Sequence, residues 1–136
     1  MLLTASPVNG EIRRYDASGA FTGVLADLAG APWDMAFGPN ANLFVLTNAN
    51  GVVELNPTTG AVIGTFASPA NLVQPRGMCF LPDGRLLVVN WGNDTIWAFN
   101  ASGADLGQWN DEFPVESPWG ITVGPNGNVY TARRAD

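Results

Sequence analysis

One phrase recurs three times along the chain at a constant interval. It reads "PWDMAFGPNANLF" from Pro32, "PRGMCFLPDGRLL" from Pro75 and "PWGITVGPNGNVY" from Pro118, and each copy starts 43 residues after the previous one. A repeat of roughly 40 to 50 residues, made of short apolar runs without helical periodicity, indicates stacked units of antiparallel strands. The interval therefore predicts an all-β chain built from similar units.

Each period supplies the four strands that a β-propeller blade requires. In the second period the apolar runs cover residues 76–82, 85–91, 95–100 and 104–109, and Pro-Asp-Gly, Gly-Asn-Asp and Ala-Ser-Gly turns separate them. The first period repeats this order as "DMAFG", "NLFVLT", "VVELN" and "AVIGTFA". The first run of each period is almost continuously apolar, so we expect neighbouring blades to cover both of its faces.

The second period also resembles a known repeat. The segment "LLVVNWGNDTIWAFNASGADL" (residues 86–106), preceded by "PRGMCFLPDGR", is similar to an NHL repeat. The resemblance implies a propeller of the six-bladed superfamily, which also includes gluconolactonase-like and strictosidine synthase-like propellers. The chain departs from the pattern at Asn90, where such repeats often carry Asp, and at Asp34, which replaces the glycine seen at Gly77 and Gly120.

The repeat divides the chain into two whole blades and two partial ones. Residues 32–74 and 75–117 are each expected to form a blade, while residues 1–31 supply outer strands and residues 118–136 supply inner strands. About three blades are too few to close a ring, since propellers close with roughly 4 to 8, and an open arc leaves apolar blade faces in water. We therefore expect residues 1–31 of another copy to complete the blade begun at residue 118, giving a six-bladed homodimer. The alternative is that the chain is an excised or engineered fragment of a longer propeller.

One strand position is represented twice. "MLLTAS" at the N-terminus resembles the second strand of a blade, and "NVYTAR" at residues 128–133 is its counterpart. We expect one of these two segments to fray or to be displaced, and the sequence leaves open which one.

Composition excludes several kinds of site. The chain has no histidine and a single cysteine, so a Ser-His-Asp triad, a histidine-ligated zinc and an intramolecular disulfide are excluded within it. Cys79 lies in an apolar run and is expected in the core. Twelve acidic and six basic residues give a net charge of −6, which argues against binding nucleic acid.

Targeting signals are also missing from the residues given. No apolar stretch approaches the roughly 18 residues of a membrane span, and "MLLTASPVNG" has neither a basic start nor a long apolar core. We expect a soluble chain without a membrane segment or signal peptide, and its compartment is left open.

Loops that differ between repeats mark the expected binding surface. They join second to third strands and each fourth strand to the next blade, whereas the turns on the other face are nearly uniform. Tryptophan and asparagine side chains on the variable face would give a lining suited to a small polar ligand or a glycan: Trp91, Asn48, Asn90, Asn93, Trp33 and Trp119. The alternative is that the tryptophans wedge adjacent blades together.

Metal binding has two candidate locations. Asp34 replaces glycine in an inner strand, where a carboxylate needs a partner, so it could bind a cation such as calcium in the central channel or make a local hydrogen bond. Asp111, Glu112 and Glu116 could also hold calcium, although their spacing fits no standard calcium loop and equally suits a solvated acidic loop.

Three classes of function follow. The first is a non-catalytic, self-assembling binding module that needs no cofactor and takes a protein, peptide, glycan or small polar ligand. The second is a metal-dependent lactonase or ester hydrolase, which the resemblance to gluconolactonase-like propellers implies. The third is a propeller fragment whose main property is assembly.

Overall fold

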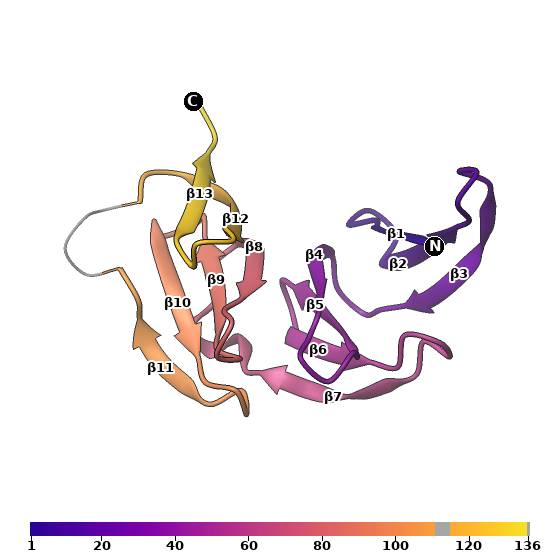
Figure 1. The fold of residues 1–136 in the computed structure, drawn as a ribbon, viewed down its shortest axis with the longest axis horizontal. Helices are drawn as coiled ribbons and strands as arrows, with labels where there is room; N and C mark the ends of the chain where they lie inside the picture. Colours follow the sequence, from indigo (N-terminus) through magenta and orange to yellow (C-terminus); the bar gives the residue numbers. More distant parts are fainter. Residues whose placement is uncertain (111–114, 136) are drawn as a thin grey trace.

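A computed structural model describes residues 1–110 and 115–135 as an open arc of four small antiparallel sheets (Figure 1). Thirteen strands and one 3-10 helix, η1 (Pro69–Asn71), make up its regular structure, and the described residues contain no α-helix. The predicted all-β architecture is confirmed. No helix in the described part of the chain is long and apolar enough to cross a membrane.

Each sheet is a meander that we name as a blade. Blade A holds β1 (Leu2–Ala5), β2 (Glu11–Tyr15) and β3 (Phe21–Asp27). Blade B holds β4 (Pro32–Phe37), β5 (Leu43–Thr47), β6 (Gly51–Leu55) and β7 (Val62–Ala67). Blade C holds β8 (Pro75–Phe80), β9 (Leu86–Asn90), β10 (Thr95–Phe99) and β11 (Asp105–Gln108). Blade D holds β12 (Pro118–Val123) and β13 (Val129–Arg133).

Alternation along the strands fills three seams, one between each pair of neighbouring blades. Because successive side chains point to opposite faces, Val45 of β5 faces blade A while Phe44 and Leu46 face blade C. Equivalent alternation in β9 places Val88 in the seam with blade B and Val89 in the seam with blade D. Burial of these apolar side chains is what holds the blades together.

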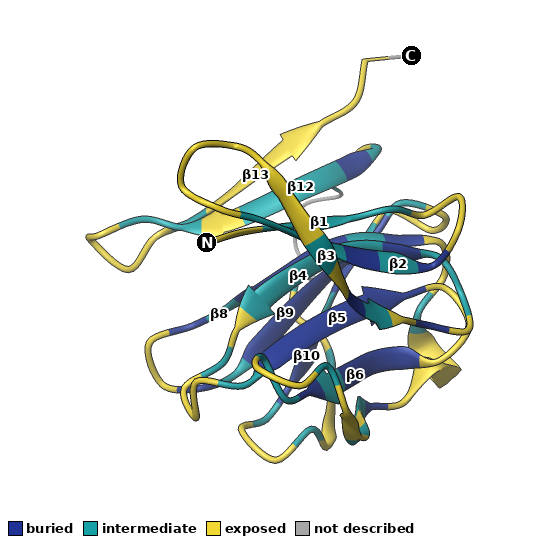
Figure 2. Ribbon diagram, turned by 90° about the vertical axis from the view of Figure 1, so that its right-hand side faces the viewer, coloured by how far each residue is buried: buried dark blue, intermediate teal, exposed yellow. Residues whose placement is uncertain are grey.

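The second strands of the two complete blades are the most enclosed elements of the fold. Every residue of β5 and β9 is buried, whereas β4 and β12 are mostly half-buried (Figure 2). The prediction that first strands are covered on both faces is only partly met, because these strands line the hollow of the arc. The first strands of blades C and D approach each other closely at Gly77, where an added Cβ would lie 2.7 Å from the carbonyl oxygen of Trp119.

The two end blades are incomplete in complementary ways. In register with the complete blades, β1, β2 and β3 occupy the second, third and fourth strand positions, while β12 and β13 occupy the first and second. Both segments that resemble a second strand are ordered: β1 pairs with β2, and β13 pairs with β12. The expected fraying of one of them is therefore absent in the single chain.

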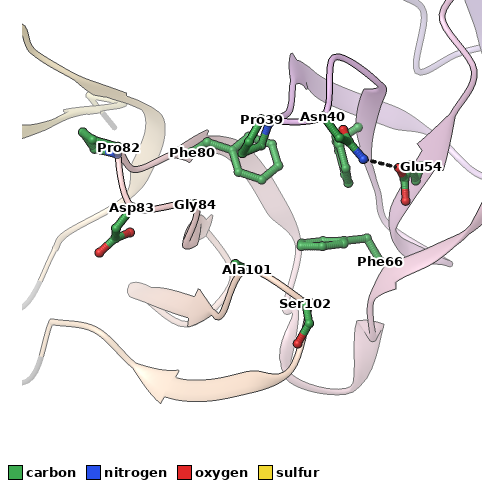
Figure 3. Close-up of a pocket in the computed structure, with 11 residues that line it drawn as sticks. Pro39, Asn40, Glu54, Phe66, Phe80, Pro82, Asp83, Gly84, Ala101 and Ser102 are labelled. Atoms are coloured by element: carbon green, nitrogen blue, oxygen red, sulfur yellow. Dashed lines mark hydrogen bonds between the residues drawn. The ribbon is translucent and has the colours of Figure 1, made fainter.

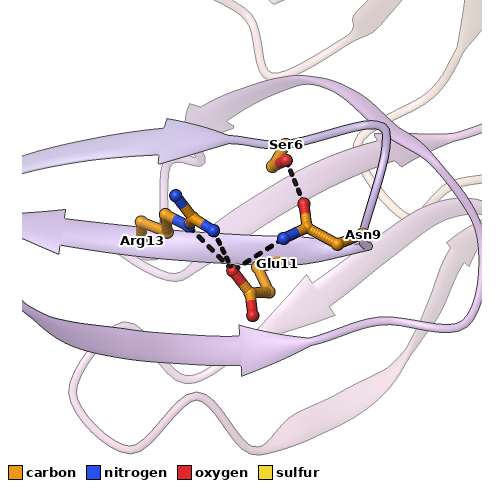
Figure 4. Close-up of polar contacts among 4 residues, drawn as sticks. All are labelled: Ser6, Asn9, Glu11 and Arg13. Carbon is orange, nitrogen blue, oxygen red and sulfur yellow. Dashed lines mark hydrogen bonds and ion pairs between the residues drawn. The ribbon is translucent and has the colours of Figure 1, made fainter.

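The outward face of blade A is unpartnered and mixed in character. Leu2, Phe21 and Val24 are exposed large apolar residues there. Beside them, Glu11 accepts hydrogen bonds from Asn9 and Arg13, and its ion pair with Arg13 measures 2.7 Å (Figure 4). This face therefore carries both apolar and charged side chains.

Candidate functional site

Three inner strands place equivalent residues side by side at the mouth of the arc. Trp33, Arg76 and Trp119 each follow the proline that opens β4, β8 and β12, so they share one position of the 43-residue repeat. The guanidinium carbon of Arg76 lies 3.9 Å from the ring centroid of Trp33 and 5.2 Å from that of Trp119. Arg76 is thus held between two indole rings by the stacking of the blades.

Two further side chains extend this group, which we name the tryptophan–arginine cluster. Trp91 follows β9, and its ring centroid lies 5.4 Å from the Arg76 guanidinium carbon and 6.2 Å from the Trp119 centroid. Arg134 follows β13, and its guanidinium carbon lies 5.3 Å from the Trp119 centroid. Trp33 and Trp119 meet edge to face at 6.4 Å. Cations over indole faces are attracted by the ring quadrupole, which stabilises this arrangement.

The cluster contains two buried N–H groups that find no acceptor among the described residues. Arg76 donates from one terminal nitrogen to the carbonyl oxygen of Pro75 at 3.0 Å, but its Nε has no partner in the described part of the chain. The same holds for the buried indole Nε1 of Trp33 within residues 1–110 and 115–135. Burial, and then the neighbouring charge of Arg134, lower the pKa of Arg76. Two guanidinium groups and two unpaired N–H groups suit an oxygen-rich anion such as a carboxylate, because unpaired buried donors are costly.

The predicted tryptophans and asparagines separate into two groups. Trp33, Trp91 and Trp119 converge as the sequence predicted, whereas the amides do not join them. Asn90 is fully buried: its Oδ1 accepts from the Val73 N–H, and its Nδ2 donates to Asn71 and Thr95.

The other two asparagines lie in exposed loops. Asn93 accepts a hydrogen bond from the Thr95 hydroxyl, and the backbone N–H of Asn48 donates to Ala31. The side chain of Asn90 therefore ties β9 to the preceding connection between blades B and C, and that of Asn93 stabilises its own loop.

Asp34 joins two blades through backbone groups. One carboxylate oxygen accepts from the Met35 N–H at 2.8 Å, and the other accepts from the Met78 N–H of blade C at 2.9 Å. Burial raises the pKa of the Asp34 carboxyl although these two hydrogen bonds act in the opposite sense. Both oxygens are engaged, which corresponds to the hydrogen-bonding alternative considered for this residue.

No metal-binding cluster is formed by the residues that the structure describes, since no three His, Cys, Asp or Glu side chains come together there. Of the acidic loop, Glu116 makes an exposed 2.6 Å ion pair with Arg133. Asp111 and Glu112 lie outside the described residues. Cys79 is buried as predicted, and burial raises the pKa of its thiol to about 11.

Sequence reasoning missed both arginines of the cluster. Neither Arg76 nor Arg134 belongs to the lining predicted from the sequence. The available signal was the repeat itself, because residues 33, 76 and 119 are separated by the same interval and must lie on adjacent inner strands. A register comparison would have placed Arg76 between the two tryptophans.

The same blade architecture is found in solved structures of other proteins. A streptogramin B lyase superposes with a TM-score of 0.73 at 21% identity, over 93% of this chain and 42% of that one. The fold is that of part of a β-propeller. Virginiamycin B lyase from Staphylococcus aureus gives 0.72 at 19% identity, over 96% of this chain and 47% of that one. A gluconolactonase from Xanthomonas campestris gives 0.71 at 20% identity, over 92% and 42%.

These likenesses confirm the predicted propeller architecture and concern the fold alone, because the identities are low. The chain spans less than half the length of the three propellers named above. No family model and no curated protein matches the sequence.

Proposed function

We propose that the chain is a non-catalytic, NHL-like propeller module that forms a homodimeric six-bladed ring and binds a small polar ligand on its variable-loop face. The observation that carries the assembly is the complementarity of blades A and D. Blade D of one copy and blade A of another together fill every strand position of one blade. Two such composite blades and the complete blades of both copies make six, a size within the propeller range.

Turn packing supports closure by a second copy. Gly60 and Gly103, in equivalent turns of blades B and C, lie against the preceding blade: an added Cβ would be 1.8 Å from the carbonyl oxygens of Leu25 and Phe66 respectively. Gly19 is the equivalent turn glycine of blade A, and a Cβ there would meet nothing within 4 Å. In the ring, Gly19 would lie against the Trp109 segment of the partner's blade C.

Exposed aromatic side chains at the two ends of the chain are consistent with closure by a second copy. Trp109 is 41% exposed and corresponds in the repeat to Phe66, which packs in a seam. Tyr130 on blade D is 53% exposed, and Phe21 on blade A is 58% exposed. Single exposed apolar residues are common on protein surfaces, but three large aromatic residues at the two ends of one chain indicate an interaction surface. A second copy would cover them.

A matched pair of glycine substitutions tests the assembly. Light scattering after size exclusion is expected to give about twice the 14.4 kDa chain mass. Gly19→Ala should weaken the dimer at least about tenfold, because the new methyl group would meet the partner's backbone. Gly127→Ala is the control: Gly127 has a similar φ of 81° and open space, and Ala41 already occupies the equivalent position.

Two outcomes would contradict the assembly. One is a wild-type chain that stays monomeric at micromolar concentration. The other is equal dimer affinity for Gly19→Ala and Gly127→Ala, which would remove the proposed contact.

The ligand proposal is carried by the two guanidinium groups that lie over Trp119 in the tryptophan–arginine cluster. A carboxylate could accept from Arg76 and Arg134, and the rest of a polar ligand could lie against an indole ring. A sugar acid combines both features. In the ring, the twofold axis would bring two such clusters to one channel mouth.

Calorimetric titration with gluconate and with glucose tests this proposal. Gluconate is expected to bind more tightly, and Trp91→Ala should weaken its binding by about 1–3 kcal/mol, the range for an aromatic anchor. Asp83→Asn is the control, since Asp83 lies in the opposite turn, where it accepts from the Arg85 N–H. If Trp91→Ala disrupts the ring and gluconate does not bind, the tryptophans are packing wedges and the ligand proposal is overturned.

Lactone hydrolysis is the alternative function, favoured by the structural likeness to a gluconolactonase. Its weakness is the inner-strand carboxylate: both oxygens of Asp34 accept backbone hydrogen bonds. Lactonase activity that a chelator abolishes and calcium restores would replace the non-catalytic proposal. Assembly without gluconate binding or lactonase activity would leave the third class, a fragment that only assembles.

A further inference from the structure

A second candidate site lies on the opposite face of the molecule, where tight turns join the strands. A pocket of about 520 Å³ opens there in the seam between blades B and C (Figure 3). Its rim includes Asn40 from the β4–β5 turn, Asp83 and Gly84 from the β8–β9 turn, and Ser102 from the β10–β11 turn. Its volume falls within the range of small-molecule sites.

Three phenylalanines form the apolar wall of this pocket. Phe44 meets Phe66 and Phe80 edge to face, with ring centroids 5.0 Å apart in both pairs. Phe44 is held in place by Gly38, where a Cβ would lie 2.2 Å from the ring. Phe66 and Phe80 are only half-buried, so part of their ring surface faces the pocket. Aromatic faces present negative potential to a ligand.

Glu54 supplies a negative charge beside these rings. It projects into the seam from β6, at a repeat position that holds Arg14 in blade A and Ala98 in blade C. Its Oε1 accepts hydrogen bonds from the side-chain amides of Asn40 at 2.8 Å and Asn42 at 2.7 Å.

No cation accompanies this carboxylate among the described residues. The other carboxylate at the rim, Asp83, pairs with Arg85 at 2.8 Å, and Glu11 in blade A pairs with Arg13. Glu54 makes no such ion pair in the described part of the chain, and its Oε2 has no hydrogen-bond partner there. An oriented, half-buried carboxylate without a cation therefore faces an aromatic wall.

We propose that this pocket binds an organic ammonium ion with a short apolar body. The ammonium group would donate to Glu54 Oε2, and its positive charge would also be attracted by the faces of Phe66 and Phe80. The apolar body would fill the space between the two blades. Both blades belong to one chain, so this site is independent of ring assembly and of the tryptophan–arginine cluster.

Benzylammonium and its neutral counterpart benzyl alcohol are the probes. Titration followed by NMR is expected to shift the amide resonances of Gly84 and Ser102, with benzylammonium binding at least about tenfold more tightly than benzyl alcohol. Glu54→Gln should remove most of this preference while keeping an oxygen acceptor for Asn40 and Asn42. Phe66→Leu should weaken benzylammonium binding and leave benzyl alcohol within about twofold.

Glu11→Gln is the matched control, since Glu11 is a carboxylate paired with Arg13 in blade A, outside the pocket, and its loss should leave the preference for benzylammonium in place. Equal affinity of the two probes for the wild-type chain would overturn the proposal. An unchanged preference in Glu54→Gln, or resonance shifts confined to the tryptophan–arginine cluster, would do the same.

Discussion

The closed seams and the open ends of the arc use the same repeat positions differently. Phe99 of blade C is almost fully buried against blade B, while the equivalent Tyr15 of blade A is half-buried on the unpartnered face. Trp97 packs against the core of the seam with blade B, and its counterpart on blade A is Arg13. The unpartnered face of blade A thus replaces apolar positions with amphipathic and charged ones.

Blade D shows a related difference on its own open face. Tyr130 corresponds to Phe44 and Leu87, which are buried in closed seams. Thr122 corresponds to Cys79, which is buried, and is itself exposed. The backbone architecture is maintained to the last strand while the outer side chains become more polar. Closed seams are therefore expected to contribute more to the stability of the single chain than the same positions at its ends.

Truncating the equivalent aromatic residues should give the largest contrast. Phe99→Ala is expected to lower the free energy of unfolding by about 3–5 kcal/mol, because a large buried ring leaves a cavity. Tyr15→Ala should cost about 1 kcal/mol in the single chain, because its side chain is only half-buried. Urea unfolding at a dilute concentration, where the chain is monomeric, checks both values. Similar losses of unfolding free energy in the two variants would contradict the expected difference between a closed seam and an open end.

The turn glycines sharpen the comparison with a smaller effect. Gly103→Ala should destabilise the chain by about 2–4 kcal/mol, since it combines a positive φ with a methyl group forced against the Phe66 carbonyl. Gly19→Ala, which has the same φ of 86° and open space, should cost only about 1 kcal/mol in the monomer. Thermal unfolding of the two variants at equal concentration would show whether the blade contact accounts for the difference.

The pH dependence of one seam should give the smallest signal. The Asp34 carboxyl has a pKa above its ordinary 3.8 in the folded chain, so between the two values the folded state holds a proton that the unfolded state has lost. The free energy of unfolding should therefore fall as pH rises through this window. Below the window the carboxyl is protonated in both states, so this loss of stability is absent. Asp34→Asn should remove this part of the slope. Parallel wild-type and variant profiles from about pH 3.5 to 6 would contradict the assignment.

The strands, turns and blade order were predictable because they depend on local patterns that the repeat displays three times. The convergence of Trp33 and Trp119 was also predictable, since both open inner strands. Asn90 could not be assigned in this way. Its direction into the protein is set by partners at Val73 and Asn71, which lie in a connection between blades that does not repeat.

The pocket at Glu54 was beyond sequence reasoning for a related reason. Its lining comes from three strands and a turn of blade B and from β8 and two turns of blade C, so no continuous segment contains it. In the sequence Glu54 looks like an ordinary solvent-facing residue in a strand. The packing of blade C against blade B brings Phe80 into the same pocket as Glu54 and Phe66.

The double occupation of one strand position by β1 and β13 has a kinetic consequence. Each of these strands is already hydrogen-bonded within its own sheet, so joining blade A to blade D requires one pairing to break before the other can form. Such a step is an exchange within a chain rather than an encounter between chains. Dimer formation by this route would become independent of protein concentration once encounters are frequent, and the outgoing strand would emerge as a newly exposed, protease-sensitive segment.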